Sequence, residues 1–258
     1  PANRSIGNTP PGQAQLVLNA PLTLCDGAVY EWRNASGYAA NLTSDERQAK
    51  LISKRVVKTL AEMNLAEART FHDRTRREYY IMEGGRALVY GYFTDAWYLY
   101  DPFPLTHLFE RDGELYGAGG ECGFVRFSRR YQSDGGEKID ACWRSGAMAF
   151  GADFRRKHSA RVFIVMKPEQ RSHITVSAVT DSGGITGGET VSVGLSGFSD
   201  ADFRHWSFGT NRAPHTRKLR IRTRKFAFYQ LLLTSGNDWS TATVLGADVR
   251  LRAAGQVR

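Results

Sequence analysis

The chain has 258 residues, 41% of them hydrophobic and 24% charged, which is enough for one or two buried cores. Its net charge of +9 and its pI near 9.6 permit a polyanionic partner without requiring one. No apolar run approaches the roughly 18 residues of a membrane span, and the N-terminus lacks the basic-then-apolar pattern of a signal peptide, so we expect no export and no membrane insertion.

The three cysteines, Cys25, Cys122 and Cys142, are far apart and have no metal-ligand spacing. An odd number of scattered cysteines is typical of reduced, partly buried thiols in a reducing cytosol. We therefore expect no disulfide framework, no metal and no cofactor.

The first predicted element is a strand that begins at an Asp-Gly turn, Asp26–Trp32. A helix is predicted next, at about residues 45–68, with Ser44 or Asp45 as its N-cap. Its apolar residues recur at helical spacing: Ala49, Ile52, Val56, Leu60 and Met63. Its other side carries Lys50, Lys54, Arg55 and Lys58, which indicates either a solvated face or a contact with nucleic acid or an acidic partner.

An internal repeat follows the predicted helix. Four residues recur at an offset of 36, as the pairs Glu78 and Glu114, Tyr80 and Tyr116, Gly84 and Gly120, and Val89 and Val125. Each copy is predicted to be a hairpin, in which an aromatic strand, a glycine turn and a second apolar strand follow one another. Residues 26–32 match the second copy in their Asp-Gly-x-apolar-Tyr pattern, and residues 94–100 add a further aromatic strand.

Repeats of about 40 residues built from strands are the size of a β-propeller blade of roughly four strands. The alternative is an irregular β-meander whose hairpins share only their turn chemistry. Residues 1–135 hold about three blades, whereas a closed propeller typically has at least about four. Since the chain also opens Pro1-Ala2-Asn3 without methionine, we expect a portion of a larger protein.

The repeat character ends near Ser133–Gly136, which predicts a domain boundary after residue 135. The predicted strands beyond it are 160–167, 173–180, 189–195, 226–233 and 243–251. We therefore predict an all-β chain, with partial propeller blades and one inserted helix in residues 1–135 and an antiparallel β-sandwich in residues 136–258.

A basic strand is predicted in the second domain. Strict alternation in Lys218–Arg224 places Arg220, Arg222 and Arg224 on one face and Leu219, Ile221 and Thr223 on the other. Adjacent guanidinium groups repel one another, so acidic groups on a neighbouring strand or subunit, passing phosphates or solvent must compensate them. The candidate residues for an interface or a lumen are Arg217, Lys218, Arg220, Arg222, Arg224, Lys225, Trp97, Trp206 and Trp239.

Motifs of catalysis are missing from the sequence. It has no Gly-x-Ser-x-Gly elbow, phosphate-binding glycine loop or His-Glu-x-x-His zinc helix, and its histidines are scattered singly. A glycosidase could use two carboxylates among the acids near the predicted blade edges, which are Asp95, Asp101, Glu110, Asp112 and Glu114. Asp-Gly turns explain these acids without catalysis, so we expect a protein that is not an enzyme.

From about Asp26 to Gly255, the chain resembles the C-terminal half of the β-propeller tail proteins of tailed bacteriophages, a group that includes the tail tubular or nozzle proteins of short-tailed phages. The segments that carry the resemblance are 26–30, 45–50, 77–80, 95–100, 112–116, 139–151, 203–208 and 239–245. The chain lacks the preceding blades of that family.

The resemblance implies a virion component that is assembled in the host cytoplasm as a homo-oligomeric ring, expected to be a hexamer. Its partners would be the portal-adaptor and the tail fibre or spike proteins, and genomic DNA would pass transiently through its lumen. Exposed aromatic residues would serve the interfaces, and most arginines would pair with acids across subunits.

Two other hypotheses remain open. The chain could be a carbohydrate-binding or receptor-binding module, with Trp97, Tyr98 and Tyr100 as a stacking platform. It could also be a cellular propeller scaffold without any viral context. The oligomeric state distinguishes the nozzle hypothesis from the binding-module hypothesis, because a nozzle must form a closed ring and a binding module need not.

Overall fold

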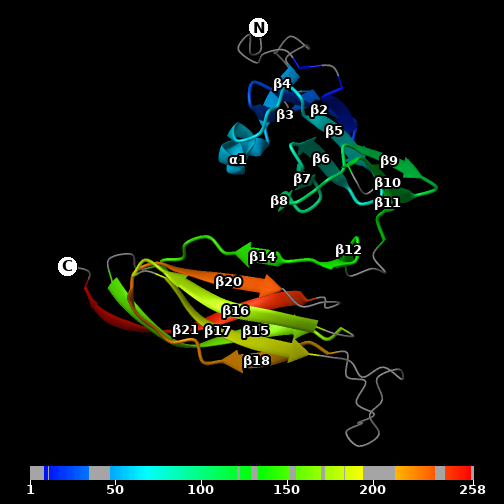
Figure 1. Cartoon of the computed structure of the whole chain (residues 1–258). Coiled ribbons are helices and arrows are strands. Elements are labelled where there is room, and N and C mark those ends of the chain that lie inside the picture. Colours follow the sequence, from blue (N-terminus) through cyan, green and yellow to red (C-terminus); the bar gives the residue numbers. More distant parts are fainter. Residues whose placement is uncertain are drawn as a thin grey trace, which may run out of the picture. The chain divides into compact units, whose positions relative to one another are not determined.

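A computed structural model describes residues 9–10, 12–34, 47–120, 123–128, 133–151, 155–169, 172–182, 184–193, 213–235 and 242–256 (Figure 1). The chain divides into two compact units, Pro1–Ser128 and Arg129–Arg258. The predicted boundary after residue 135 falls inside a small hairpin near the start of the second unit, between β12 (Ser133–Asp134) and β13 (Glu137–Lys138).

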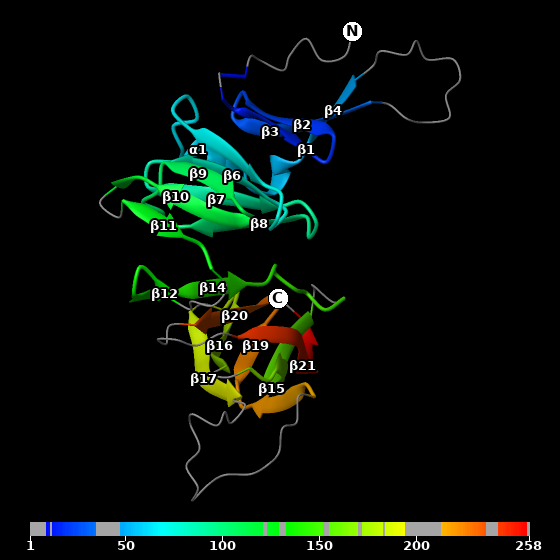
Figure 2. The same cartoon turned by 90° about the vertical axis from the view of Figure 1, so that its right-hand side faces the viewer.

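The first unit consists of three antiparallel sheets that follow one another along the chain, coloured from blue to green in Figure 2. We call them blades 1, 2 and 3. Blade 1 is β1 (Ala14–Val17), β2 (Ala20–Cys25), β3 (Ala28–Asn34) and β4 (Arg47–Leu51). Blade 2 is β5 (Arg69–Asp73), β6 (Glu78–Glu83), β7 (Arg86–Gly91) and β8 (Ala96–Tyr100). Blade 3 is β9 (His107–Arg111), β10 (Glu114–Ala118) and β11 (Phe124–Arg126).

Each blade is a meander, because every strand pairs with the next one in the sequence. The first strands of successive blades lie beside one another, β1 beside β5 and β5 beside β9. Blade-sized meanders joined at their innermost strands are the arrangement of a β-propeller, so the predicted partial propeller is confirmed.

Tight turns with positive φ set the register of these hairpins. Asp26 and Gly27 have φ of 47° and 74°, and Asp112 and Gly113 have φ of 54° and 76°. Two successive left-handed residues form the type I′ turn that two-residue hairpins prefer. The 26–32 segment therefore shares its turn with blade 3, but its turn joins the second and third strands of blade 1, whereas Asp112-Gly113 joins the first and second strands of blade 3.

The predicted repeat is present in the structure as equivalent strands. Glu78 and Tyr80 lie on the second strand of blade 2, and Glu114 and Tyr116 lie on the second strand of blade 3. The third strands differ by one position, since Tyr80 pairs with Val89 but Tyr116 pairs with Arg126. The longer connection between β10 and β11 causes this shift, and it turns Val125 to the opposite face of its blade.

The predicted helix over residues 45–68 is largely wrong. Residues 47–51 form β4, which pairs with β3, and only a 3-10 turn (Ser53–Arg55) and α1 (Val57–Ala61) are helical. Pairing with β3 supplies the backbone partners of residues 47–51, and this tertiary interaction outweighs the local helical pattern. The predicted N-cap, Ser44 or Asp45, lies outside the described residues.

Blade 2 is buried on both faces. Tyr79 and Ile81 pack with residues of blade 1 and with Leu60 of α1, whereas Tyr80 and Met82 pack with residues of blade 3. The predicted helical spacing of Ile52, Val56, Leu60 and Met63 therefore does identify core residues, although little of that segment is helical.

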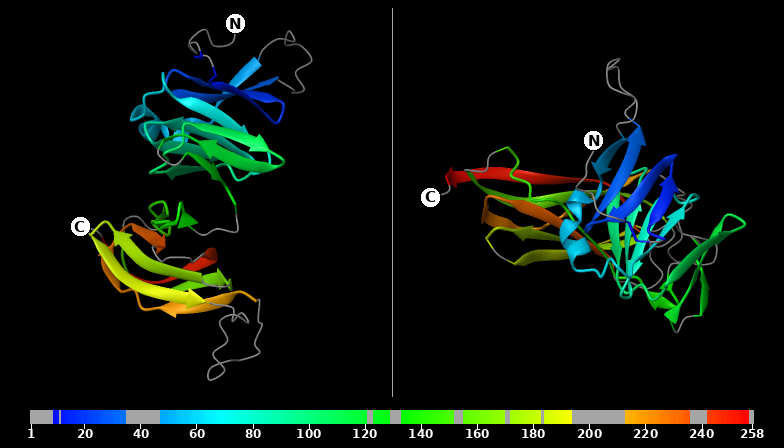
Figure 3. Two further views of the ribbon diagram at one scale, coloured as in Figure 1. Left: turned by 45° about the vertical axis from the view of Figure 1, so that its right-hand side comes forward. Right: turned by 90° about the horizontal axis from the view of Figure 1, so that it is seen from above.

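The second unit is an antiparallel sandwich with one buried core (Figure 1). One sheet has the order β14 (Ala141–Arg144), β20 (Tyr229–Ser235), β16 (Ser172–Thr180) and β17 (Ile185–Val193). In the other, β18 (His215–Leu219) and β19 (Thr223–Phe226) pair with β15 (Arg155–Lys167), and β21 (Thr243–Gln256) pairs with β15 over almost its whole length (Figure 3). The predicted sandwich is confirmed.

Asp181 fixes the passage of the chain from one sheet to the other. Its Oδ1 accepts hydrogen bonds from the backbone N–H groups of Ala227 and Phe228, at 2.8 and 3.0 Å. These residues join β19 of one sheet to β20 of the other. A single carboxylate thereby satisfies two donors at a point where the backbone leaves its ladder.

Candidate functional site

The outer face of the sheet formed by β18, β19, β15 and β21 is strongly basic. On β15, the side chains of Val162, Ile164 and Met166 are buried in the sandwich core, so the alternate residues point outward. We define the basic face as the outward cations of this sheet and of the β18–β19 connection, which are Arg156, Arg161, Lys167, Lys218, Arg220, Arg222, Arg224, Arg250 and Arg252. Asp248 is the one acidic residue of these four strands.

Cross-strand pairing brings cations from distant parts of the sequence together. Arg161 of β15 lies directly opposite Arg250 of β21, and His158 lies opposite Arg252. A shift in register between Ser159 and Arg161 allows Ser159 to face the core while Arg161 points outward. Like charges opposite one another destabilise a sheet, so this face gains stability when an anion approaches it.

Phe163 lies at the centre of the basic face. It pairs with Lys218 on one side and with Asp248 on the other, and the Arg250 guanidinium carbon lies 5.0 Å from the centroid of its ring. This cation–π contact holds the Arg250 guanidinium beside the Phe163 ring. An aromatic ring flanked by cations is a surface on which both phosphates and flat rings can rest.

The alternation predicted for residues 218–224 is confirmed by burial. Leu219, Ile221 and Thr223 are buried, while Arg220, Arg222 and Arg224 are exposed. The continuous strand is wrong, however, because residues 220–222 leave the ladder between β18 and β19. Both carboxylate oxygens of Glu189 accept from the backbone N–H of Arg220 at 2.9 Å, and this interaction takes the place of a ladder bond.

The other two basic candidates are placed differently. Arg217 pairs with the inward residue Ile164, yet its own side chain is exposed at the sheet edge. Lys225 has a φ of 54°, its backbone N–H donates to His158 Nδ1, and its carbonyl accepts from Arg156 at 2.8 Å. Among the described residues, no ion pair neutralises the guanidinium groups of the basic face.

Among the tryptophan candidates, Trp97 has a packing role. Its ring stacks on Tyr90 with centroids 4.8 Å apart, and its indole N–H donates to the Ile52 carbonyl. The ring therefore lies against the core between blades 1 and 2. Trp206 and Trp239 lie outside the described residues.

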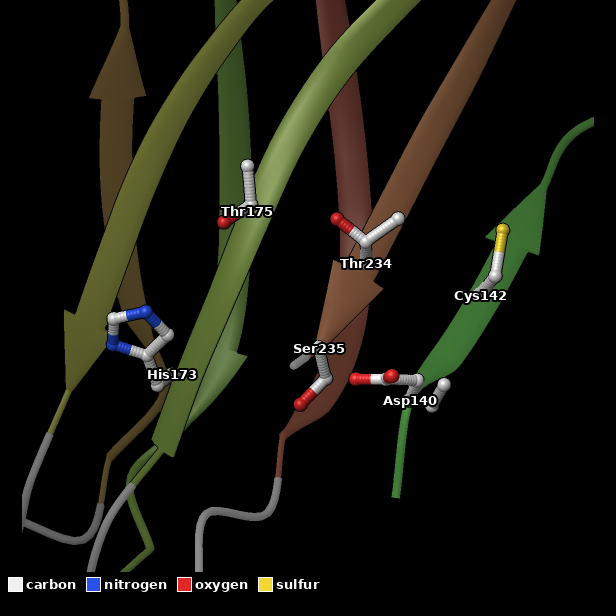
Figure 4. A pocket seen from close by; sticks show the side chains of 7 residues that line it. Asp140, Cys142, His173, Thr175, Thr234 and Ser235 are labelled. Atoms are coloured by element: carbon white, nitrogen blue, oxygen red, sulfur yellow. The ribbon is translucent and has the colours of Figure 1, made fainter. Parts of the chain in front are cut away.

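A shallow pocket lies on the outer surface of the other sheet of the sandwich (Figure 4). Its lining combines an acid, a histidine and several hydroxyls from three strands: Asp140, Ala141, Cys142, His173, Thr175, Thr234 and Ser235. His173 Nδ1 forms its hydrogen bond with Ser192 at 3.0 Å, and Asp140 pairs with Lys138 at 3.3 Å. Asp140 and one ring nitrogen of His173 are thus held by partners outside the lining.

The acids near the blade edges are also held by neighbours. Asp95 pairs with Arg55, Asp101 with Arg86 and Asp112 with Arg111, while Glu110 accepts from Thr75 and Glu114 from Tyr116. The described part of the chain shows no group of three or more side chains suited to a metal ion. None of its helices is long and apolar enough to span a bilayer.

No protein-family model and no curated protein matches the chain. Among solved structures, it is similar to an exo-β-1,3-galactanase from Phanerochaete chrysosporium with galactose, at 11% identity and a TM-score of 0.24, over 95% of this chain and 68% of that one. A variant of the same protein with β-1,3-galactotriose is similar at 10% identity and a TM-score of 0.22, with the same coverage. Similarity at this level does not extend to any site.

The basic face of unit 2 is thus the best-defined candidate site. The arginine-rich segment predicted from the sequence supplies one edge of it. Sequence reasoning missed Arg156, Arg161, Arg250 and Arg252, which come from β15 and β21. The alternation of Val249, Arg250, Leu251 and Arg252 was the signal that could have found the last two.

Proposed function

We propose that this chain is a structural, non-enzymatic subunit of a bacteriophage tail. Copies of it form a nozzle or hub ring of about six, next to the portal-adaptor and the fibre or spike proteins, and genomic DNA passes the ring during ejection. The observation that carries the proposal is the basic face, which is broad, lies on a sheet and has no ion pairs among the described residues.

A broad basic face without a deep pocket suits a polyanion that passes along it better than a small substrate that must be held in place. Guanidinium contacts to phosphates supply affinity that does not depend on the base sequence of the DNA, and salt weakens these contacts strongly. Where some arginines of the basic face pair with acids of a neighbouring copy, the attraction to DNA falls, and passage becomes easier. The scaffold needs no cofactor for this role.

The mass of the purified particle tests the ring. Native mass spectrometry and electron-microscopy class averages of the full-length chain are expected to give a closed ring of about six copies with a central channel. The same ring should bind other tail proteins when it is co-purified with them. A stable monomer under all these conditions would be incompatible with the proposal.

A carbohydrate-binding or receptor-binding module is the alternative. Tyr98 and Tyr100 of β8 are 46% and 39% exposed and could stack against a sugar, but Trp97 is turned into the core. A monomer that binds glycans, and loses this binding when Tyr98 is replaced by alanine, would favour the alternative over the ring.

A further inference from the structure

Among the described residues, no blade covers the apolar face at either end of the three-blade stack. Inside the stack, Tyr79 faces blade 1 and Tyr80 faces blade 3, and both are almost fully buried. Both faces of blade 2 are therefore covered, one by blade 1 and the other by blade 3. Within the described residues, no blade lies against the outward face of blade 1 or of blade 3.

The outward face of blade 3 carries an aromatic cluster. Phe109 stacks on Tyr116 with ring centroids 5.4 Å apart, and Phe124 meets Phe109 edge-on at 6.3 Å. Phe124 is 78% exposed and Phe109 is 37% exposed. Tyr116 is the repeat equivalent of Tyr80, which blade 3 itself covers in blade 2. The outward face of blade 3 therefore corresponds to the face of blade 2 that blade 3 covers.

Charges on this face are already neutralised within it. The Arg126 guanidinium lies 3.5 Å from Glu114 Oε2, which also accepts a hydrogen bond from the Tyr116 hydroxyl at 3.1 Å. Arg111 pairs with Asp112 at 3.5 Å. A partner surface that is apolar and uncharged can therefore cover the cluster without leaving an unpaired charge.

The outward face of blade 1 has that character. Thr23, Tyr30 and Leu51 are aligned across β2, β3 and β4, and the indole N–H of Trp32 donates to Thr23 at 2.7 Å. Leu16 of β1 lies on the same side and is 58% exposed, and Leu51 is 40% exposed. By register, Arg47 at the start of β4 is the one charged residue that the described strands place on this face, and it lies at the far end from Leu51 and Leu16.

We propose that the outward face of blade 3 binds the outward face of blade 1 of a second copy, in continuation of the blade stacking within each chain. The two faces lie at opposite ends of one stack, so the contact is head-to-tail and closes into a ring when the rotation permits. The inference rests on the ring of the proposed function, but not on its assignment to a phage tail.

Charge substitutions at the two faces test the contact. Phe124→Glu and Leu16→Glu change exposed side chains, so each variant should fold, as far-ultraviolet circular dichroism would verify. Each is expected to weaken self-association by at least about tenfold in native mass spectrometry and light scattering. Phe93→Glu is the matched control, because Phe93 is 75% exposed but lies in the turn between β7 and β8, outside both faces.

Cross-linking locates the contact directly. Phe124→Cys and Leu16→Cys are placed in separately tagged copies in which Cys122 and Cys142 are replaced by serine. Mixed copies are expected to form a disulfide that joins the two tags, whereas two copies of the same variant do not. A Phe93→Cys copy mixed with the Leu16→Cys copy provides the background level.

The outcomes separate the two proposals. A wild-type oligomer that the Phe124 and Leu16 variants disrupt, together with the mixed disulfide, supports the contact. An oligomer that neither variant affects overturns the contact and leaves the proposed ring intact. A wild-type monomer overturns both.

Discussion

Glu189 holds the backbone of Arg220 across the open edge of the sandwich. Both of its carboxylate oxygens lie 2.9 Å from the Arg220 nitrogen. Glu189 belongs to β17 of one sheet, and Arg220 lies between β18 and β19 of the other. An acid on a neighbouring strand is one of the three partners considered for the arginine strand. Glu189 is such an acid, but it binds the backbone N–H of Arg220 rather than a guanidinium group, so the Arg220 guanidinium stays available to the basic face.

Replacing Glu189 by alanine should lower the free energy of unfolding by about 1 kcal/mol, because a charge-assisted hydrogen bond at a half-exposed site is lost. Glu189→Gln keeps an oxygen acceptor and should lose less. Urea denaturation followed by tryptophan fluorescence measures both. Glu137→Ala, an exposed acid of the same unit, is the control and should leave the midpoint unchanged. Equal midpoints for all three variants would contradict this role of Glu189.

The repeated glutamate–tyrosine pair should differ in energy between blades. Tyr80 is buried and donates to Glu78 at 2.6 Å, and burial first, then Glu78, raises the pKa of Tyr80. Tyr80→Phe is therefore expected to cost about 1.5 kcal/mol of unfolding free energy. At concentrations low enough to keep the copies apart, Tyr116→Phe should cost less than about 0.5 kcal/mol, since water can then replace the bond on the open face.

Thermal or urea unfolding of the two phenylalanine variants provides the comparison. If Tyr116→Phe costs as much as Tyr80→Phe, the face of blade 3 is covered in solution, which would agree with the proposed contact between copies. If neither substitution has an effect, the pair contributes nothing to the stability of either blade.

The blades could be predicted because their signals are local. Asp112 and Gly113 adopt the left-handed turn that the dipeptide predicts, and the strands on either side follow from it. The strand at Ala49 could not be predicted, because the residues around Ala49 have a helical pattern in the sequence. Their backbone nevertheless pairs with β3. The residues between β3 and β4 give no sequence signal for this pairing. Pairing between strands is a tertiary interaction that local periodicity does not contain.

The same limit applies to the basic face. The alternation around Arg222 identified one edge from consecutive residues. Arg161 and Arg250 are separated by most of the second unit in the sequence, and their position opposite one another follows only from the register of β15 with β21. A cluster of cations built across strands is visible only after that register is known.

Tyr229 gives the second unit a pH dependence at high pH. It is fully buried, its hydroxyl has no hydrogen-bond partner among the described residues, and burial raises its pKa to about 12. The unfolded chain then loses this proton at a lower pH than the folded chain. The contribution to stability is complete below about pH 10 and is lost as the pH rises from about 10 to about 12.

Tyr229→Phe should remove that part of the pH dependence. At neutral pH the variant should be as stable as the wild type, or up to about 1 kcal/mol more stable, since a buried hydroxyl without a partner is deleted. Urea midpoints at pH 8 and pH 11 measure this, and the difference between wild type and variant should change in favour of the variant at pH 11. A variant that is less stable than the wild type at pH 8 would show that the hydroxyl has a partner.

DNA binding should depend on the cations that the strands bring together. Non-specific binding by guanidinium groups weakens with salt, with a slope of about −0.9 per phosphate contact in a plot of log binding constant against log salt concentration. The Arg161→Gln/Arg250→Gln double variant should therefore bind a fluorescent duplex more weakly than the wild type and reduce the magnitude of the slope by about 1.8. Fluorescence anisotropy at several salt concentrations measures both quantities.

A matched control separates the basic face from net charge. The Lys50→Gln/Lys54→Gln double variant removes the same number of exposed charges from the first unit, so its net charge equals that of the arginine variant. If the affinity for DNA depends only on the net charge of the protein, both double variants lose affinity equally, and the basic face has no special role. If the face binds phosphates, the lysine variant keeps the wild-type slope, because its charges lie outside the contact.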